Sequence, residues 1–403
     1  MKVLICHNCY RLESGEDIVF VNETELLRRH GHQVIEYARA NNEIDKLGVV
    51  QNIELAAKAV WNWRSYRQVR DIILKHRPDI AHFHNTLPLI SSAAYDACVE
   101  HGVPVIQSLH NARLFCPQGS MYYGGGHCEV CIGRSLPWHG IARACYRKSH
   151  MQSALIGITT AVNWKRGVWT DKIDRYIVFN SFYREKFIQA GLPAEKIVLK
   201  PHSVEDPGPV VEPGGYVLYA GRLTEAKGVS ILLRAWGKSG RIPLKLCGEG
   251  ELECEVGRLV KTSAGGIEWF GHVPRKRVIE LIKGAAFLIW PSWNETFGLI
   301  ALEAFACGRA VISSRVPPMS ELVEDNRTGI VFRAGDADDL ADKVGWAWAH
   351  PEEMRRMGCE ARKKYEANYS AEANYKTLIG IYSDVIKGKK RASGAVSNRS
   401  FLT

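Results

Sequence analysis

The feature that most constrains the fold of this chain is an alternation of short apolar runs with helical patterns. Runs rich in valine and isoleucine recur through most of the sequence, and stretches such as 19–29 and 72–76 show helical spacing between them. Strands that alternate with helices form parallel sheets with right-handed crossovers. The sequence therefore predicts an α/β fold with doubly wound sheets. The predicted strands are 3–6, 34–37, 80–84, 105–110, 176–180 and 197–201, followed by 217–221, 245–247, 268–270, 287–290, 310–313 and 330–332.

A segment rich in proline, glycine and acidic residues, 204–215, interrupts this alternation. Such a composition is typical of a linker between domains. Two doubly wound domains joined there would face each other across a cleft at the carboxyl ends of their strands, where ligands bind in this architecture. The predicted parts are an N-terminal domain at 1–203 with a cysteine-rich loop at 113–145, a C-terminal domain at 216–370, a helix at 371–388 that could pack back on the N-terminal domain, and a disordered tail at 389–403.

Two glutamates lie on either side of a predicted helix start in the second domain. A loop carries Glu295, and a helical run that begins after Gly298 carries Glu303 near its third turn. The unpaired backbone N–H groups at Phe297, Gly298 and Leu299 suit a phosphate. Carboxylates beside an anion site accept hydrogen bonds, so we expect them to hold hydroxyl groups, which a sugar nucleotide presents on both sides of its diphosphate. The alternative is an ordinary strand–helix unit with two unrelated glutamates.

A second loop, after the first strand of the second domain, carries two cations. Gly221 permits a sharp turn at the end of that strand, and Arg222 and Lys227 follow it. A guanidinium and an ammonium are natural partners for a diphosphate. Alone, the segment would be an ordinary turn with surface charges, but the glutamate pair lies three strands further along the same domain.

Several short motifs follow one another in a fixed order along nearly the whole chain. They are Ser14-Gly15-Glu16 with Gly31-His32, His110-Asn111, Gly221-Arg222 with Lys227-Gly228, Gly248-Glu249-Gly250, Gly271-His272-Val273, and Pro291-Ser292 with the two glutamates. In this order they resemble the large family 4 of retaining glycosyltransferases, which have the GT-B fold of two Rossmann-like domains facing across a cleft. The family often has two glycines in the N-terminal loop, whereas here Ser14 precedes Gly15.

The resemblance implies a role for each of these residues. Arg222 and Lys227 would neutralise the diphosphate of the donor, so that no metal ion is required for catalysis. Glu303 would hold the ribose hydroxyls and Glu295 the hydroxyls of the transferred sugar, while His110 would lie beside that sugar. The other donor-binding residues would be Gly15, Gly221, Gly248, Gly250, His272, Val273, Phe297, Gly298 and Leu299.

The implied activity is transfer of a hexosyl unit from a UDP- or GDP-sugar to an acceptor hydroxyl, with retention at the anomeric carbon. The departing phosphate oxygen would help to deprotonate the acceptor. One alternative is a phosphorylase or epimerase on the same architecture. Another is a basic scaffold on a degenerate GT-B fold that binds nucleic acid or membrane. The charged motif residues are all retained, which favours the transferase and leaves nucleic acid outside the expected partners.

The net charge of +10 lies mostly in the first half of the chain, beside aromatic residues. Cations interleave with tryptophan at 61–77 and again at 141–170, and the second stretch contains no acidic residue. Such segments suit an anionic membrane surface or nucleic acid, and they also occur as solvated helix faces. Together with the resemblance, they predict a saccharide or lipid-linked acceptor and a cytoplasmic protein, peripheral on the inner face of the plasma membrane.

Four of the eleven cysteines cluster in the loop at 113–145. Cys116, Cys128, Cys131 and Cys145 could hold a structural zinc ion, with His127 or His139 replacing one ligand. The alternative is a set of reduced, packed thiols. Asp336-Ala337-Asp338 has the form of a metal-binding DxD motif, but it follows Gly335 at a predicted helix start, where capping is expected.

Overall fold

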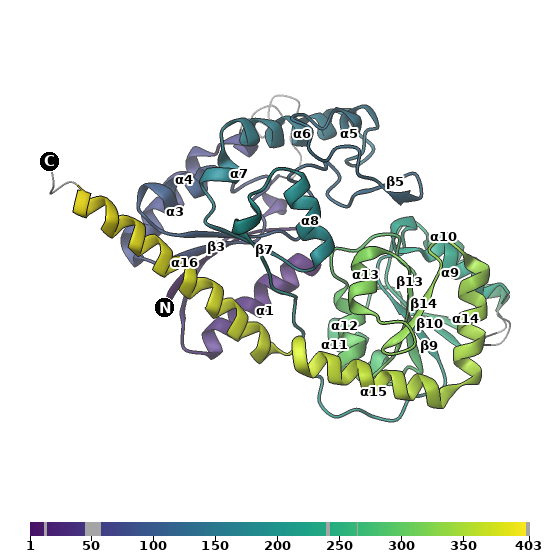
Figure 1. Ribbon diagram of the computed structural model, residues 1–403. Coiled ribbons are helices and arrows are strands. Elements are labelled where there is room, and N and C mark those ends of the chain that lie inside the picture. The colour runs from purple at the N-terminus through teal and green to yellow at the C-terminus, as the bar shows by residue number, and fades with distance from the viewer. Residues whose placement is uncertain (12–13, 45–57, 239–241, 264, 400–403) are drawn as a thin grey trace. The chain divides into compact units, whose positions relative to one another are not determined.

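The computed structural model describes residues 1–11, 14–44, 58–238, 242–263 and 265–399 (Figure 1). The chain divides into two compact units. Unit 1 comprises residues 1–120, 129–200 and 375–403, and unit 2 comprises 121–128 and 201–374. The division between units at 200–201 lies just before the predicted linker.

Unit 1 contains a parallel sheet with the strand order β2-β1-β3-β4-β7-β8. These strands are β1 (Lys2–Cys9), β2 (Gln33–Ala40), β3 (Ile80–Phe83), β4 (Val105–Ser108), β7 (Arg175–Val178) and β8 (Ile197–Leu199). The helices are α1 (Gly15–Arg29), α3 (Trp63–His76), α4 (Ala93–Glu100), α5 (Trp138–Ala142), α6 (His150–Lys165), α7 (Val168–Asp171), α8 (Ser181–Gln189) and α16 (Ala371–Arg399), with short 3₁₀ turns η1 (Asn41–Ile44) and η2 (Ala194–Lys196).

Unit 2 contains a second parallel sheet with the order β11-β10-β9-β12-β13-β14. These strands are β9 (Val217–Ala220), β10 (Leu244–Cys247), β11 (Ile267–Trp269), β12 (Phe287–Trp290), β13 (Val311–Ser314) and β14 (Gly329–Phe332), and β5 (Tyr122–Tyr123) and β6 (Gly126–His127) form a separate hairpin. The helices are η3 (Glu225–Lys227), α9 (Val229–Trp236), α10 (Glu253–Thr262), α11 (Arg275–Lys283), α12 (Leu299–Ala306), α13 (Pro317–Leu322), α14 (Ala337–Ala349) and α15 (Pro351–Asn368).

The central strands are buried because their side chains are apolar on both faces. All four residues of β9, of β12 and of β14 are buried, as expected for parallel strands that helices cover on both sides. In unit 2, Phe287 and Ile289 of β12 belong to one core cluster with Leu232 of α9 and Leu340 of α14. A strand lies at each of the twelve predicted places, and the α/β fold is confirmed.

The strand order reverses once in each sheet, and this reversal fixes where a ligand fits. In unit 2, β9 lies between β10 and β12, so the chain builds one half of the sheet from β9 and later returns to build the other half. The loops after β9 and β12 therefore start from the carboxyl ends of neighbouring strands. Ligands of doubly wound sheets bind at this switch point. In unit 1 the corresponding strands are β1 and β3.

The C-terminal helix α16 packs on unit 1 through residues far apart in the sequence. Tyr375 stacks on His30 with 3.6 Å between the ring centroids, and the hydroxyl of Tyr382 lies 2.8 Å from Nδ1 of His82. The predicted disordered tail at 389–403 is wrong for its first part, because α16 continues to Arg399. Lys389 lies 3.1 Å from the Asp174 carboxylate, and this ion pair holds the helix to unit 1 beyond Tyr382. Residues 400–403 lie outside the described part of the chain.

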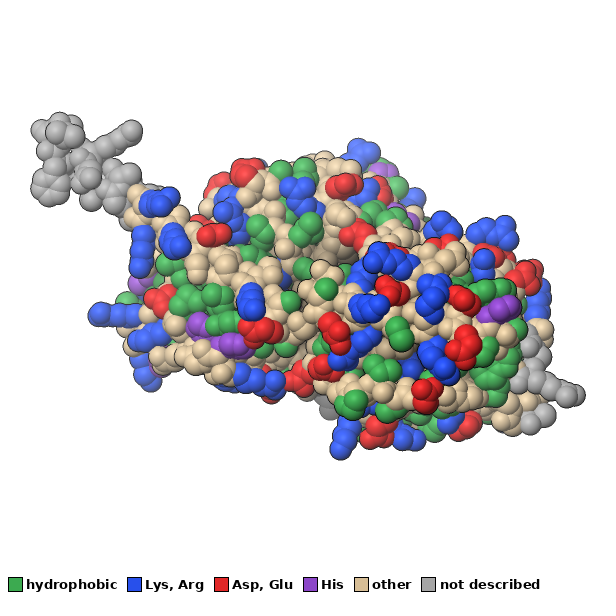
Figure 2. All heavy atoms as spheres, turned by 60° about the horizontal axis from the view of Figure 1, so that its bottom comes forward, with side chains coloured by type: hydrophobic (Ala, Val, Ile, Leu, Met, Phe, Trp, Pro, Cys, Tyr) green, Lys and Arg blue, Asp and Glu red, His purple; other side chains and the backbone are tan. Residues whose placement is uncertain are grey.

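The face of unit 2 that carries α15 has positive and negative side chains interspersed (Figure 2). On α15 the cations pair with acids three or four residues away, as in Arg356–Glu353 at 2.9 Å and Lys363–Glu360 at 2.7 Å. This is the pattern of a solvated helix face. Among the described helices, none combines the length and the apolar character needed to cross a membrane.

Candidate functional site

The three loops that follow β9, β10 and β11 are joined by backbone hydrogen bonds. The N–H of Gly221 donates to the carbonyl of Cys247 at 3.0 Å, and the N–H of Gly248 donates to the carbonyl of Gly271 at 2.7 Å. Gly248 has a φ of 130°, and a Cβ there would lie 1.9 Å from the carbonyl oxygen of Gly221. Only glycine fits such an approach. The predicted site glycines 221 and 248 thus set the spacing of the loops.

A second connection joins the loop after β9 to the loop after β12. The N–H of Trp293 donates to the carbonyl of Ala226 at 3.0 Å, and a Cβ on Gly228 would lie 2.0 Å from the carbonyl oxygen of Pro291. This contact brings the two predicted motifs together across the switch point. As a result, Lys227 Nζ lies 2.5 Å from Glu295 Oε1.

Glu295 is held by three donors that converge on one of its oxygens. Oε1 accepts hydrogen bonds from Lys227, from Trp290 Nε1 at 3.1 Å and from the hydroxyl of Ser292 at 3.2 Å. None of these three donors bonds Oε2. The carboxylate is therefore fixed in orientation while its second oxygen stays available to a hydroxyl group.

The helix start predicted after Gly298 is confirmed, because α12 begins at Leu299. Gly298 has a φ of 95°, and a Cβ there would lie 2.1 Å from the indole ring of Trp290. No side chain caps this end of the described helix. Its first backbone N–H groups and the positive end of the helix dipole thus face the loop that holds Glu295. Phe297, which precedes the glycine, is buried and its ring lies edge-on to His202 at 5.0 Å.

Glu303 lies on the same helix and is paired with a cation that sequence reasoning missed. It is the fifth residue of α12, in the second turn rather than the third, and its side chain is only 4% exposed. Arg275, the first residue of α11, forms an ion pair with its Oε1. Burial raises the pKa of Glu303 to about 7, although the charge of Arg275 acts in the opposite direction.

The remaining predicted donor-binding residues of unit 2 surround these groups at the loop ends. Arg222 is exposed and pairs with no acid in the described part of the chain, so its guanidinium is available to an anion. The N–H of His272 donates to Glu249 Oε1 at 3.3 Å, while Val273 next to it is half-buried. A Cβ on Gly250 would lie 2.4 Å from the carbonyl oxygen of Leu223, which again links the loops after β10 and β9.

In unit 1, His110 follows β4 and is buried against a second histidine. Its Nε2 lies 3.0 Å from Nδ1 of His84, whose own Nε2 lies 3.4 Å from Glu23 Oε2. Of the two facing ring nitrogens, one donates and the other accepts, and the tautomers of the two histidines decide which. Burial lowers the pKa of His110 well below 6.5, so this ring is neutral at pH 7.

The histidine pair belongs to a larger buried network that sequence reasoning missed. Glu23 forms an ion pair with Lys200, and both side chains are less than 6% exposed. His82 lies 2.9 Å from the hydroxyl of Ser108, and burial lowers its pKa to about 4. The sequence does contain a signal for this network, namely His82 and His84 in the predicted strand 80–84. Side chains two residues apart in a strand share a face, so the two imidazoles are expected on the same side.

The N-terminal motif adopts a different local structure from the one predicted. Gly15 is the first residue of helix α1 rather than part of a loop. Ser14 is the N-cap, and Asp17 returns the bond by accepting from the N–H of Ser14 at 2.8 Å. This capping box explains the serine that replaces the first glycine of the family pattern. Asp17 also lies 2.8 Å from Nε2 of His7 on β1, so the motif is tied to the strand before it.

The cysteine-rich loop contains more regular structure than predicted, since β5, β6 and α5 lie within it. Two groups of possible metal ligands occur among the described residues. They are His7 with Cys9 and Asp17, and Glu23 with His82 and His84. The cysteines at 116, 128, 131 and 145 are not joined in disulfides. The zinc site at these four residues stays a prediction, and His127 and His139 stay its alternative ligands.

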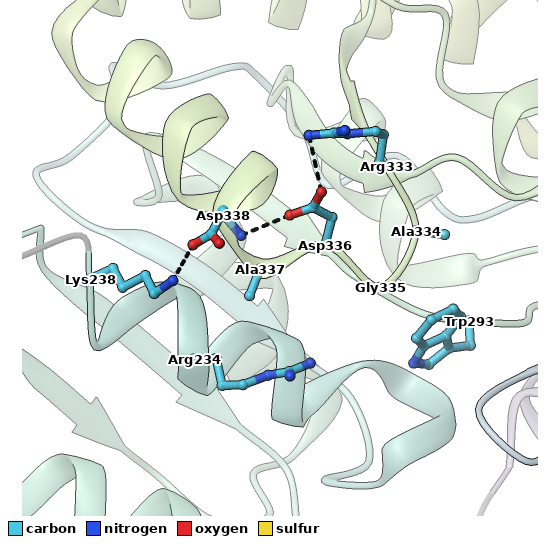
Figure 3. A pocket seen from close by; sticks show the side chains of 9 residues that line it. All are labelled: Arg234, Lys238, Trp293, Arg333, Ala334, Gly335, Asp336, Ala337 and Asp338. Atoms are coloured by element: carbon cyan, nitrogen blue, oxygen red, sulfur yellow. Dashed lines mark hydrogen bonds and ion pairs between the residues drawn. The ribbon is translucent and has the colours of Figure 1, made fainter.

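A surface pocket of about 670 Å³ lies beside the DxD-like segment (Figure 3). Asp336 accepts from the N–H groups of Asp338 and Asp339 at 3.0 Å and pairs with Arg333, while Asp338 pairs with Lys238. The predicted capping role of Asp336 is confirmed. Both carboxylates already have partners, so this pocket does not resemble a metal site.

Comparison with protein families places the two halves of the chain separately. A family described as Glycosyltransferase Family 4 matches residues 15–206, and one described as Glycosyl transferases group 1 matches residues 206–364. The two matches meet at residue 206, within the predicted linker, and together take in the motif residues from Gly15 to Glu303.

Among curated proteins, an uncharacterized glycosyltransferase of Methanocaldococcus jannaschii is 31% identical over 41% of this chain and 46% of its own length. An alpha-maltose-1-phosphate synthase of Mycolicibacterium smegmatis is 30% identical over 42% of this chain and 48% of its own length. A D-inositol 3-phosphate glycosyltransferase of Corynebacterium jeikeium is 27% identical over 41% of this chain and 43% of its own length. The chain thus spans less than half the length of these relatives.

Solved structures extend the likeness to nearly the whole chain. The Anabaena protein HepE, crystallised with UDP-glucose, matches with a TM-score of 0.67 and 16% identity over 95% of this chain and 100% of its own. A sucrose-phosphate synthase from Thermosynechococcus elongatus matches with a TM-score of 0.70 and 17% identity over 96% and 100%. At this identity the likeness concerns the fold, which is GT-B.

Proposed function

Because the chain belongs to the family 4 glycosyltransferases, we propose that it transfers a hexosyl unit from a nucleoside-diphosphate sugar to an acceptor hydroxyl, with retention at the anomeric carbon. The observation that carries this proposal is the arrangement at the switch point of unit 2. A helix start that suits phosphate lies between Glu295, with one oxygen available, and the buried Glu303. Arg222 and Lys227 supply positive charge at the same strand ends.

Each group has a distinct part in the proposed reaction. The diphosphate lies at the start of α12, where Arg222 and Lys227 stabilise the charge that develops on the leaving oxygen. Glu295 Oε2 accepts from a hydroxyl of the sugar, and Glu303 accepts from the ribose. The neutral His110 lies beside the transferred sugar, so its contribution is orientation and not charge.

The bond changes balance without a further reactant. The bond between the anomeric carbon and the phosphate oxygen breaks, and the acceptor oxygen bonds to the same face of that carbon. The acceptor proton passes to the departing diphosphate. The charges of Arg222 and Lys227 take the place of a divalent metal in this scheme. Turnover that is unchanged by EDTA agrees with this assignment, and turnover that EDTA abolishes contradicts it.

The donor is a UDP- or GDP-sugar, and the acceptor is a saccharide carried on a membrane lipid. A similar fold was crystallised with UDP-glucose, which makes that donor the first to test. The basic, aromatic segments of unit 1 support a place at the inner face of the plasma membrane.

The decisive experiment is a screen of activated sugars. Thermal unfolding and slow donor hydrolysis are measured with UDP-glucose, other UDP-sugars and GDP-sugars. We expect one donor class to raise Tm and to be hydrolysed, and Glu303→Gln to weaken both effects. Binding of RNA or DNA with no response to any nucleotide sugar would refute the proposal and favour the scaffold.

A further inference from the structure

Helix α6 has its polar side turned inward and its apolar side turned outward. Surface helices of globular proteins normally bury their apolar stripe. In α6, Met151 is 67% exposed and Ile158 is 52% exposed. The buried residues are instead small or polar, namely Ser153, Gly157, Thr159, Thr160 and Asn163.

The inward face of α6 makes hydrogen bonds to the cysteine-rich loop and to the residue that follows it. The N–H of Tyr146 donates to Ser153 Oγ at 2.9 Å, and Thr160 Oγ1 donates to the carbonyl of Arg113 at 3.2 Å. Trp164 Nε1 donates to the carbonyl of Leu114 at 2.7 Å. Because these bonds fix the rotation of the helix, its apolar stripe cannot turn inward.

The outward stripe is regular and continues onto the neighbouring helix. Met151, Leu155, Ile158 and Val162 follow the spacing i, i+4, i+7 and i+11, which keeps them on one side of a helix. Helix α5 packs beside α6 on the outside of unit 1 (Figure 1) and carries Trp138, which is 53% exposed. We call these five residues the α6 face.

Cations lie at both ends of α6, and residues 141–170 contain no aspartate or glutamate. Arg147 and Lys148 precede the helix, Lys165 ends it, and Arg166 follows and pairs with Asp96 of α4 at 3.7 Å. On α15, by contrast, the cations are matched by acids within one turn. The 16 residues of α6 give it a length of about 24 Å along the surface.

We propose that the α6 face docks unit 1 onto an anionic lipid surface, with the helix lying in the plane of the headgroups. An apolar stripe edged by Lys and Arg is the pattern that binds such interfaces, through apolar burial and attraction to anionic lipid. This docking rests on the proposed function, because a lipid-linked acceptor gives the enzyme a substrate at the membrane.

The second basic, aromatic segment, on α3, fits this role less well. Its rings pack on one another, with Trp63 and Tyr66 stacked at 5.2 Å and Arg67 over Trp63 at 4.8 Å. Acidic residues also lie within it, as Asp71 pairs with Arg70 at 3.0 Å. Helix α3 therefore supplies the control variant, Leu74→Glu, at a site that is 56% exposed.

The test measures flotation of the full-length protein with phosphatidylcholine vesicles, with and without about 30% phosphatidylglycerol. We expect binding to the anionic vesicles only. The double variant Met151→Glu/Ile158→Glu should lower that binding at least about tenfold, since it places charge on the stripe. Leu74→Glu should leave binding unchanged, and Lys148→Gln/Lys165→Gln should weaken it and reduce its dependence on salt.

Several results would overturn the proposal. They are absence of parental binding, equal binding to neutral vesicles, and equal binding by Met151→Glu/Ile158→Glu. A parental dimer in solution that this variant dissociates would assign the α6 face to a second copy of the chain instead. Donor hydrolysis, measured without vesicles, should be the same in all variants. If the parental protein hydrolyses no donor yet binds vesicles, the proposed function fails while the docking surface stands.

Discussion

Replacing Glu303 by glutamine tests the ribose-binding role of the most buried acid of the site. The side chain is 4% exposed and faces Arg275, and burial raises its pKa to about 7. Glutamine keeps the shape of the side chain but loses the charge and one acceptor position. Hydrogen bonds to an ionised group contribute about 1.5–3 kcal/mol. The variant should therefore bind the donor about 10- to 150-fold more weakly.

The same pKa predicts how donor binding changes with pH. Only the ionised carboxylate accepts from both ribose hydroxyls, so donor affinity should fall as the pH drops below about 7. At about pH 6 roughly one molecule in ten is ionised, and KM for the donor should be about tenfold higher than at about pH 8. An intact sugar nucleotide has no phosphate group that titrates in this range, so the change belongs to the protein.

Stability should respond in the opposite direction. The folded state holds a proton on Glu303 between the ordinary pKa of 4.5 and about 7, whereas the unfolded state has lost it. Through this group, the free energy of unfolding should fall by about 3 kcal/mol as the pH rises across that window and then level off. Glu303→Gln removes this slope, so it should not destabilise the protein at about pH 8.

The assay is donor hydrolysis, with KM measured from about pH 5.5 to 8.5 and urea unfolding measured on the same samples. Glu280→Gln, an exposed acid on α11, is the matched control and should leave both profiles unchanged. If Glu303→Gln binds the donor as tightly as the parental protein, the ribose assignment is refuted. If the pH slope of KM persists in the variant, another group is responsible for it.

Three further predictions concern other parts of the structure. Gly298→Ala should lower kcat/KM at least about tenfold, because its Cβ would meet the Trp290 indole that orients Glu295; Gly257→Ala, where nothing lies within 4 Å, is the control, and equal activity of the two variants would contradict the reasoning. Arg222→Ala and Lys227→Ala should each lower kcat about 100-fold or more, and a change confined to KM would argue against stabilisation of the leaving group. Glu23→Gln should destabilise unit 1 by about 3–5 kcal/mol in urea unfolding, because it leaves Lys200 buried without its partner, whereas Glu23→Leu/Lys200→Met should be close to the parental protein; equal loss in both variants would contradict this account.

Much of the fold could be predicted because local pattern and tertiary environment agree. Apolar runs such as Phe287–Trp290 are strands because they are buried on both faces, and Gly298 marks a helix start because only glycine fits there. The first part of the tail was mispredicted because its composition is polar. It is the end of α16, and that helix is held to unit 1 by Tyr382 and by the ion pair of Lys389 with Asp174. No local sequence pattern indicates contacts between residues that lie hundreds of positions apart.

The sequence predicted which residues belong to the candidate site, but not which of them form ion pairs with one another. Arg222, Lys227, Glu295 and the helix start lie at neighbouring strand ends, as the topology requires. The contact of Lys227 with Glu295 and that of Arg275 with Glu303 depend on loop spacing, which the glycines set through three-dimensional approach. The charged network behind His110 was missed for the same reason, as Glu23 and Lys200 are 177 residues apart.

The course of the chain between the two units has a consequence for the order in which they can be completed during synthesis. Unit 2 is, apart from one hairpin, a single continuous stretch, whereas unit 1 is closed only by the last helix. His82 meets the hydroxyl of Tyr382 across 300 residues, so its partner is synthesised 300 residues later. A ribosome translating this chain therefore completes unit 2 while the buried histidines of unit 1 still lack the helix that covers them.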